Sequence, residues 1–556
     1  MAWSYEAELR ARLEHEKNFV GDGGGHLRFA LAYPNSYRVG MSNLGIHIIY
    51  GLLNSRRDVA CERFFLPEAS TLEKISRANV PLLSLETQTP LQKFQVVGFA
   101  VSFEPDYFNV VKMLKLGKIN PRSSERTNLD PIIIAGGPCA TFNPAPLAEI
   151  FDAFVVGEGE VVLPPLIDEI IATEHLPRLQ RLEKISRLAG VYVPNFPRRV
   201  ARQWLTDLDA SPAHSTILTD DAEFNMYLLE TARGCGRHCR FCMAGYCFRK
   251  PRNRSLDVLK KNIADAKKFG KKIGLMGAAI SDYPQIDALC KFISDAHLQM
   301  SVASFRADSV TAELVQSLAA SGLKTLTIAP EVGSDKMRAV VNKGLTEEHV
   351  FTAVELGLKA DIKNFRLYFM VGLPFEEFAD VEAIAELSAR VKKFCGGRLT
   401  LSVNPFVPKP FTPFQWAPFA QKKYLDAAFK LLRGALKSIR GVEIISESVR
   451  SAQVQAILAR GDKALSRIVA QSESVQDFRQ NFKAAGLDED FYLRGRDFDE
   501  NLPWDFLEQG FTKKYLLDEF KRAAALKSTP KCFDGCTRCG VCKLTDSEAQ
   551  YKIFRT

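Results

Sequence analysis

Three cysteines on one short loop constrain this chain more than any other feature of its sequence. Cys235, Cys239 and Cys242 stand at spacings of four and three residues, directly after the apolar stretch 225–230. Thiolates are the usual ligands of iron–sulfur clusters. Three thiolates on one tight loop leave the fourth iron of a four-iron cluster without a protein ligand, so that this iron can bind a small chelating molecule. The spacing therefore predicts a catalytic cluster rather than a plain electron carrier.

A structural zinc site is the alternative interpretation of this loop. Structural zinc takes four ligands, and Cys247 is close enough in sequence to complete the set. Phe241 and the following Met243-Ala-Gly are more typical of a cluster pocket than of a zinc knuckle. We therefore favour the cluster.

The CxxxCxxC spelling of these three cysteines resembles the signature of the radical SAM enzymes. In that family the open iron holds the amino and carboxylate groups of S-adenosylmethionine (SAM), and an electron from the cluster cleaves the sulfonium to give a 5′-deoxyadenosyl radical. The resemblance implies that the three cysteines are both catalytic and metal-binding. It also implies SAM as a partner and an electron donor such as flavodoxin or ferredoxin.

The composition limits where the protein works. No run of about 18 apolar residues occurs and no charged-then-apolar pattern opens the chain, so we expect a cytoplasmic protein with no membrane partner. Twelve cysteines in such a chain favour metal or cluster binding over disulfides. The net charge of +9 permits an anionic partner without requiring one.

Residues 1–175 alternate apolar runs with helical patterns, which predicts an open, doubly wound α/β sheet of the Rossmann type with ligands at the strand carboxyl ends. The predicted strands are 26–32, 96–103, 131–135 and 153–156, with helical patterns near 41–55, 106–117 and 161–172. Small residues follow these strands, and they suit either a bulky ligand or tight βα turns. The candidates for cofactor binding are Ser102, Gly136, Gly137 and Gly157.

A Rossmann-like domain ahead of a CxxxCxxC barrel resembles the cobalamin-binding radical SAM proteins. The stretch 33–45 also resembles one uncharacterised branch of that group. The DxHxxG loop, whose histidine ligates cobalt in many cobalamin proteins, is missing, and His47 lies in an apolar helix where we expect a packed core residue. The resemblance implies cobalamin without a histidine ligand, or a domain that keeps the fold and has lost the cofactor.

Residues 176–220 are proline-rich and are predicted to form a linker arm. Over 221–450 the strand-then-helix pattern repeats and predicts a partial (β/α)6 barrel with its site at the strand carboxyl ends. The predicted strands are 227–231, 273–276, 301–305, 325–329, 365–371 and 399–403, with helices near 255–269, 284–296, 311–320, 346–358 and 376–394.

The resemblance to radical SAM enzymes implies SAM-binding residues at these strand ends. Gly274 and Gly277 correspond by position to the glycine-rich segment that meets the SAM amino group, although the usual GGE spelling is absent. Charged or polar residues that could bind the carboxylate, ribose or amino group of SAM follow the third and fourth strands. Gly372 opens a Gly-Leu-Pro segment that resembles the family's adenine-contacting segment. The full set is Gly274, Gly277, Ser304, Arg306, Glu331, Arg338 and Gly372.

Seven basic residues and no acid lie between Arg233 and Arg254. We rank compensation of cluster charge first among their roles and an RNA partner well behind. The stiff segment 404–416, rich in proline and aromatic residues, resembles runs in the methylthiotransferases, and is predicted to be a pocket wall or an interdomain strap.

Residues 451–556 are predicted to form a helical C-terminal region that ends in a second group of cysteines. Four cysteines within eleven residues are a strong metal signal, for which zinc and a second [4Fe–4S] cluster are equally suitable. These are Cys532, Cys536, Cys539 and Cys542.

The sequence as a whole predicts a three-part radical SAM enzyme that uses cobalamin to methylate an unactivated carbon of an unidentified substrate. Two alternatives stay open. One is a cobalamin-independent radical SAM reaction, such as methylthiotransferase-like sulfur insertion or a rearrangement. The other is a non-catalytic RNA-binding or scaffold protein with a structural cluster.

Overall fold

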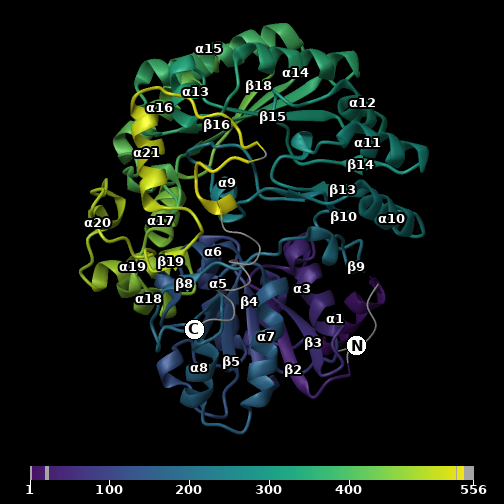
Figure 1. The fold of residues 1–556 in the computed structure, drawn as a ribbon, viewed down its shortest axis with the longest axis vertical. Helices are drawn as coiled ribbons and strands as arrows, with labels where there is room; N and C mark the ends of the chain where they lie inside the picture. Colours follow the sequence, from purple (N-terminus) through teal and green to yellow (C-terminus); the bar gives the residue numbers. More distant parts are fainter. Residues whose placement is uncertain (1–2, 19–23, 534, 544–556) are drawn as a thin grey trace.

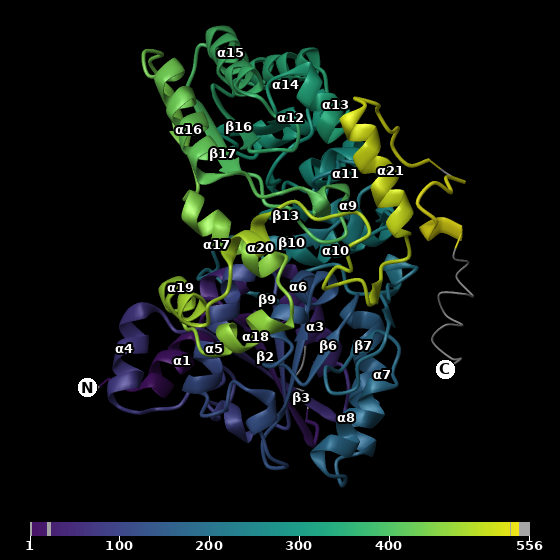
Figure 2. The same cartoon turned by 90° about the vertical axis from the view of Figure 1, so that its left-hand side faces the viewer.

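The computed structural model describes residues 3–18, 24–533 and 535–543. An N-terminal sheet with its helices and a barrel-like unit lie end to end, and the C-terminal helices run along one side of both (Figure 1, Figure 2). The predicted fold class is confirmed: a Rossmann-like sheet, a partial barrel, and a mainly helical C-terminal part. The proposed domain boundaries stay a prediction.

The N-terminal sheet has the strand order β3-β2-β4-β5-β6-β7, in which only β7 is antiparallel. The chain enters at β2, passes to β3, and then crosses to β4 on the other side, so the topological switch point lies between β2 and β4. Ligands of such sheets bind outside the strand carboxyl ends at this point. The strands are β2 (Leu27–Tyr33), β3 (Val59–Phe65), β4 (Val96–Ala100), β5 (Ile132–Gly136), β6 (Ala153–Val155) and β7 (Val191–Tyr192).

Helices pack around this sheet because its central strands β4, β5 and β6 are apolar along their whole length, which requires cover on both faces. The predicted helical patterns at 41–55, 106–117 and 161–172 correspond to observed helices. The helices of this part are α1 (Tyr5–Glu14), α3 (Leu44–Asn54), α4 (Ala69–Arg77), α5 (Tyr107–Leu116), α7 (Gly159–Ala172) and α8 (Arg178–Ser186).

The edge strand β3 was not predicted. Its sequence contains Glu62 and Arg63, which are typical of a surface segment rather than a buried strand. Arg63 is nevertheless fully buried, where it pairs with Glu16 at 2.6 Å and with Glu86 at 2.7 Å. The burial of these charges is compensated by partners that lie far away in sequence.

The barrel strands are parallel and form a three-stranded and a four-stranded sheet, in the orders β10-β13-β14 and β15-β16-β17-β18. A single parallel bridge between Phe305 and Ile328 joins the two. Strand β18 adds a seventh member to the six predicted. The strands are β10 (Tyr227–Glu230), β13 (Ile273–Met276), β14 (Met300–Ser301), β15 (Thr325–Glu331), β16 (Asn364–Val371), β17 (Leu399–Pro405) and β18 (Val442–Ile445).

The third predicted strand, 301–305, is wrong in its extent. Strand β14 ends at Ser301, and Phe305 keeps only the single bridge to β15. The chain leaves the sheet here and carries Arg306 to the cysteine loop, where it lies 3.7 Å from Cys239 Sγ. Five barrel helices follow the prediction closely: α10 (Leu256–Lys267), α11 (Ile286–Asp295), α12 (Ala312–Ala320), α14 (Glu347–Lys359) and α15 (Phe378–Cys395). A further helix, α16 (Lys422–Leu436), follows β17.

Residues 176–220 contribute short strands to three different sheets. Strand β7 extends the N-terminal sheet, β8 (Val200–Ala201) pairs with β19 (Leu507–Glu508), and β9 (Ile217–Leu218) pairs with β1 (Lys17–Asn18). The arm therefore ties the first and last parts of the chain together. The C-terminal helices are α17 (Val449–Ala459), α18 (Lys463–Ala470), α19 (Val475–Ala484), α20 (Glu489–Leu493) and α21 (Lys513–Ala524).

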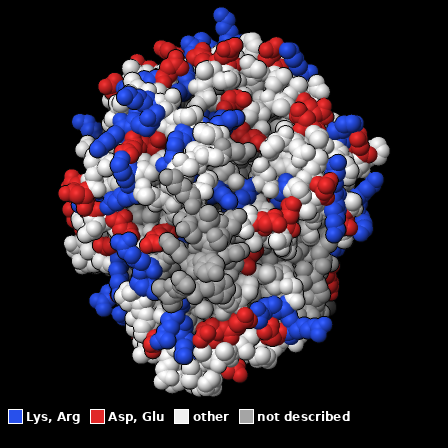
Figure 3. All heavy atoms as spheres, viewed as in Figure 1, with Lys and Arg blue, Asp and Glu red and all other residues white. Residues whose placement is uncertain are grey.

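Two observations bear on possible partners, one on surface charge and one on the helices. On the face seen in Figure 3, described Lys and Arg side chains are interspersed with Asp and Glu. Within the described ranges, none of the helices combines the length and apolar character needed to cross a bilayer.

Candidate active site

The cysteine loop begins at the carboxyl end of β10 and turns back so that its sulfurs meet N–H donors. The Arg237 amide donates to the first sulfur at 3.4 Å, Arg306 Nη1 lies 3.7 Å from the second, and the Gly245 amide donates to the third. Such donors stabilise thiolates and cluster-bound sulfur. The three sulfurs belong to Cys235, Cys239 and Cys242.

Burial sets the protonation of these thiols. It raises the pKa of Cys235, and burial together with the adjacent Cys239 raises the pKa of Cys242 to about 11. A bound metal deprotonates a coordinating thiol outright. Three thiols on one loop, each with an N–H donor, fit a [4Fe–4S] cluster that leaves one iron open. Such a cluster, when bound, supplies one electron to a ligand on that iron.

A buried ion pair stands beside the loop. Lys343 Nζ lies 2.9 Å from Glu331 Oε1 and 5.9 Å from the Phe241 ring centroid, and the Lys343 carbonyl accepts from Arg306 Nη2 at 2.5 Å. Glu331 ends β15 at a break in register and has φ +70°. Positive φ is uncommon for a residue with a side chain and clusters at functional sites. Arg306 and Glu331 thus both contact Lys343, and their roles toward SAM stay a prediction.

Lys343 was missed by the sequence analysis. It follows α13 (Asp335–Val341) at Asn342, whose φ of +52° ends the helix, and precedes Gly344. The only sequence signal was this Asn-Lys-Gly helix ending, which is typical of an exposed cap. The lysine is instead buried because Glu331 and the aromatic ring receive it.

The other predicted SAM residues lie in more ordinary surroundings. Arg338 donates to Asp335 Oδ1 at 2.7 Å and to the Gly333 carbonyl at 3.0 Å, so its contacts are with its own turn. Gly277 follows β13 beside Thr231, and Gly372 has φ +83° and donates its amide to Glu376 at 2.6 Å. Two more lie at the barrel without a charged contact: Gly274 within β13 and the half-buried Ser304.

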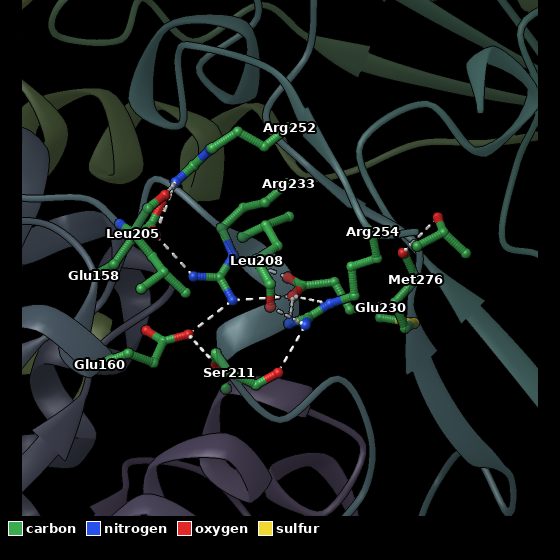
Figure 4. A network of polar contacts seen from close by, with 12 residues as sticks. Glu158, Glu160, Leu205, Leu208, Ser211, Glu230, Arg233, Arg252, Arg254 and Met276 are labelled. Carbon is green, nitrogen blue, oxygen red and sulfur yellow. Dashed lines mark hydrogen bonds and ion pairs between the residues drawn. The ribbon is translucent and has the colours of Figure 1, made fainter. Parts of the chain in front are cut away.

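Three arginines of the basic loop pair with acids, some of which lie far away in the sequence, and this contact was not predicted. Arg233 reaches Glu158 at 2.9 Å, Glu160 at 2.8 Å and Glu230 at 3.0 Å. Figure 4 shows these carboxylates around one guanidinium, between the N-terminal sheet and β10. Arg252 pairs with Glu158 and Arg254 with Glu230, each at 2.6 Å. Arg233 and Arg252 thus connect the barrel unit to Glu158 of the N-terminal unit, whereas Arg254 pairs within the barrel unit; compensation of cluster charge by the rest of the loop stays a prediction.

This network predicts acid sensitivity of the contact between the domains. Arg233 and Arg252 outweigh the effect of burial and hold the pKa of Glu158 below its usual value. A carboxylate with a lowered folded pKa contributes stability above its unfolded pKa of about 4.3 and loses it as pH falls through the folded value. Thermal melts from pH 7 to pH 3 should show a falling midpoint, and Glu158→Gln should flatten that fall. A Glu158→Gln curve parallel to that of the wild type would contradict the prediction.

A cavity of about 310 Å³ lies at the carboxyl ends of the N-terminal strands. Three residues of the barrel unit, Glu230, Arg233 and Phe248, complete its wall. The predicted loop residues all line it: Ser102, Gly136, Gly137 and Gly157. Gly137 and Gly157 have positive φ and close backbone neighbours, Val101 and Gln203, so a side chain is excluded there by the fold itself.

His47 is a core residue, as predicted. Its Nε2 lies 3.0 Å from the Met41 carbonyl, and burial lowers its pKa to about 4. The segment 404–416 connects the two units, since Lys409 pairs with Glu104 at 2.5 Å and Phe411 packs on Phe142. A strap between domains is therefore the better interpretation of that segment.

The C-terminal tail packs on the cysteine loop. Arg240 is fully buried and donates to the Lys527 carbonyl at 2.7 Å and to Glu519 of α21 at 3.1 Å. Asn342 Nδ2 bridges the carbonyls of His238 and Thr529, each at 3.0 Å. Among the described residues, no three His, Cys, Asp or Glu side chains gather as closely as a single metal ion requires.

A three-cysteine loop after β10 of a parallel partial barrel, with an ion pair at the end of β15, is the arrangement that a site for an iron–sulfur cluster with one open iron requires. The family profiles agree: residues 45–194 match "Radical SAM proteins, N-terminal" and residues 229–388 match "Radical SAM superfamily". The chain belongs to the radical SAM superfamily and is a radical SAM enzyme.

Two similar proteins extend this comparison. The uncharacterized protein MJ0966 of Methanocaldococcus jannaschii is 32% identical over 453 residues, which cover 80% of this chain and 91% of that protein. The solved radical SAM methyltransferase TsrM of Kitasatospora setae, with cobalamin and a [4Fe–4S] cluster bound, aligns at a TM-score of 0.51 and 11% identity. The alignment covers 82% of this chain and 99% of TsrM. This likeness shows the fold.

Proposed function

We propose that the protein binds cobalamin in the N-terminal cavity and transfers a methyl group to an unactivated carbon of its substrate. One observation carries the proposal: a single cavity is lined both by the loops after β4, β5 and β6 and by Glu230 and Arg233, which directly precede the cysteine loop. A ligand held there would lie between the loops of the N-terminal sheet and the residues that lead into the cysteine loop. TsrM, which shares the fold, was solved with cobalamin bound.

The cavity is lined mainly by apolar and small residues, beside the charged side chains of Glu158, Glu160, Glu230 and Arg233. Its floor is apolar, with Leu31, Gly98 and Ile134, and its rim carries Ser102 and the amide-rich Gly136-Gly137 turn. Apolar walls with few polar groups are typical of cofactor sites. His47 is bonded to the Met41 carbonyl within the core, so we do not propose it as a cobalt ligand.

The chain's own residues would bind SAM and shield it. Glu331 would accept the amino group of SAM and Arg306 would pair with its carboxylate, while Lys343 sets the position of both. The [4Fe–4S] cluster supplies the electron, and the corrin, when bound, supplies the methyl group. The Arg233 network closes the side between the domains, which limits access of water to the radical.

Filling the cavity from Gly136 tests the proposal. Gly136 lines the cavity, has no positive φ, and a Cβ built on it meets nothing closer than Val155 Cβ at 3.8 Å. Gly136→Leu should therefore fold but lose bound corrin. The measurement is cobalamin absorbance after reconstitution with hydroxocobalamin and gel filtration, with about one corrin per wild-type chain and a loss of about tenfold or more in affinity for the variant.

Gly434→Leu is the matched control. Gly434 lies in α16, outside the cavity, and a Cβ there meets nothing within 4 Å. This variant should retain full corrin binding. Wild-type protein that binds no corrin, or Gly136→Leu that binds it as tightly as the control, would refute the proposal and leave a cobalamin-independent radical SAM reaction as the alternative.

We further propose a reducing compartment such as the cytoplasm, because the described cysteines are free thiols. The electron donor is proposed to be a flavodoxin or ferredoxin.

A further inference from the structure

Cys532, the first cysteine of the C-terminal group, contacts the loop that carries Cys235, Cys239 and Cys242. The Cys532 amide donates to the Gly236 carbonyl at 2.8 Å, and Cys532 Sγ lies 3.4 Å from His238 Nε2. His238 immediately precedes Cys239 in the chain. A path from the Cys532 sulfur to the SAM-cluster ligand therefore crosses one non-covalent contact and then continues through covalent bonds.

The contacts of His238 determine which ring nitrogen carries the proton. Arg249 Nη1 lies 3.2 Å from His238 Nδ1, and the Tyr515 hydroxyl lies 2.5 Å from the same atom. A guanidinium only donates, so Nδ1 accepts and Nε2 carries the hydrogen. His238 is thus an N–H donor to the Cys532 sulfur and not itself a metal ligand.

The remaining sulfurs lead outward from this contact. Cys536 and Cys539 are buried, and Arg538 Nε donates to Cys536 Sγ at 3.3 Å. Cys542 is exposed. The motif therefore has one end against the SAM-cluster loop and the other at the surface. N–H donors to cluster sulfurs raise the reduction potential and ease electron uptake.

We propose that Cys532, Cys536, Cys539 and Cys542 hold a second [4Fe–4S] cluster that relays electrons from an external donor to the SAM cluster. The proposal rests on the SAM-cleaving activity but not on cobalamin. A one-electron donor of the flavodoxin or ferredoxin class is oxidised as the second cluster is reduced. That electron passes to the SAM cluster and on to SAM, whose C5′–S bond breaks to give methionine and the 5′-deoxyadenosyl radical.

The surroundings of the exposed end fit an acidic donor. The segment 521–533 contains four basic residues and no acid. Lys521, Lys527, Lys531 and the nearby Arg538 are exposed. Because charge attraction steers association and is screened by salt, donor-driven turnover should fall as ionic strength rises.

Iron content and donor dependence test the relay. Anaerobically reconstituted full-length protein should hold about eight irons per chain, and Cys536→Ser/Cys539→Ser about four. With reduced flavodoxin the variant should form 5′-deoxyadenosine about 10- to 100-fold more slowly. With dithionite, a small reductant that reaches the SAM cluster directly, the rate should be unchanged.

Two further variants keep the test decisive. Cys542→Ser replaces an exposed proposed ligand, so it carries the least risk to folding. It should slow flavodoxin-driven cleavage of SAM and leave dithionite-driven cleavage unchanged. Cys395→Ser, which alters a buried thiol at the end of α15, should behave as wild type.

One zinc with about four irons in the wild type would overturn the second cluster. Equal losses with flavodoxin and dithionite would overturn the relay, whereas no dithionite-driven cleavage in the wild type would instead refute the SAM-cleaving activity itself.

Discussion

Replacing Cys239 by alanine is expected to reduce the cleavage of SAM to the level of protein-free solution. Cys239 is the middle ligand of the loop, and Arg306 Nη1 lies 3.7 Å from its sulfur. Two remaining thiolates do not hold a cubane firmly, and without it no electron reaches the sulfonium. The measurement is 5′-deoxyadenosine formed under dithionite, together with iron content, which should fall by about four per chain.

Cys247→Ala is the matched control for this prediction. Cys247 is buried at the end of the short helix Ala244–Cys247 that follows the loop, and the charged groups that act on it are Arg202 and Glu158. Under the alternative of a zinc site, Cys247 would be the fourth ligand, and its loss would release metal. We expect it to retain iron and SAM cleavage. Equal damage from both substitutions would favour the zinc site.

The cysteine loop and most strands were predictable because their signals are local. Three sulfurs within eight residues form a site wherever the loop folds, and unbroken apolar runs predict buried parallel strands. Strand β3 failed this rule because Glu62 and Arg63 lie within it. Their burial depends on Glu16 and Glu86, which no local window includes.

The polar parts of the site were less predictable for the same reason. Arg233 and Glu158 are separated by 75 positions, and His238 and Cys532 by 294. From Arg233 to Arg254 the sequence contains no acid, which favoured compensation of cluster charge. Only the fold brings Glu158 and Glu160 to it, so the loop proves to be an interdomain contact. The left-handed conformation of Glu331 likewise had no signal in the sequence.

Replacing Arg233 by methionine is expected to have the largest effect on stability, about 3–5 kcal/mol, because one buried guanidinium serves several carboxylates. Its side chain is 11% exposed, and those of its partners range from 3% to 12%. Methionine fills similar volume but leaves Glu160 without its guanidinium partner, while Glu158 and Glu230 keep only Arg252 and Arg254. Urea unfolding followed by tryptophan fluorescence should show an early transition in which the N-terminal sheet separates from the barrel.

Arg398→Met provides the comparison for this effect. Arg398 and Glu443 form an exposed pair, 64% and 47% accessible, whose loss should cost about 0–1 kcal/mol. Adding Glu160→Gln to Arg233→Met should recover part of the stability, since it removes one uncompensated charge. Arg233 also lines the cavity, so separation of the units should weaken corrin binding in parallel. Arg233→Met as stable as Arg398→Met would mean that apolar packing, and not this network, holds the N-terminal unit against the barrel.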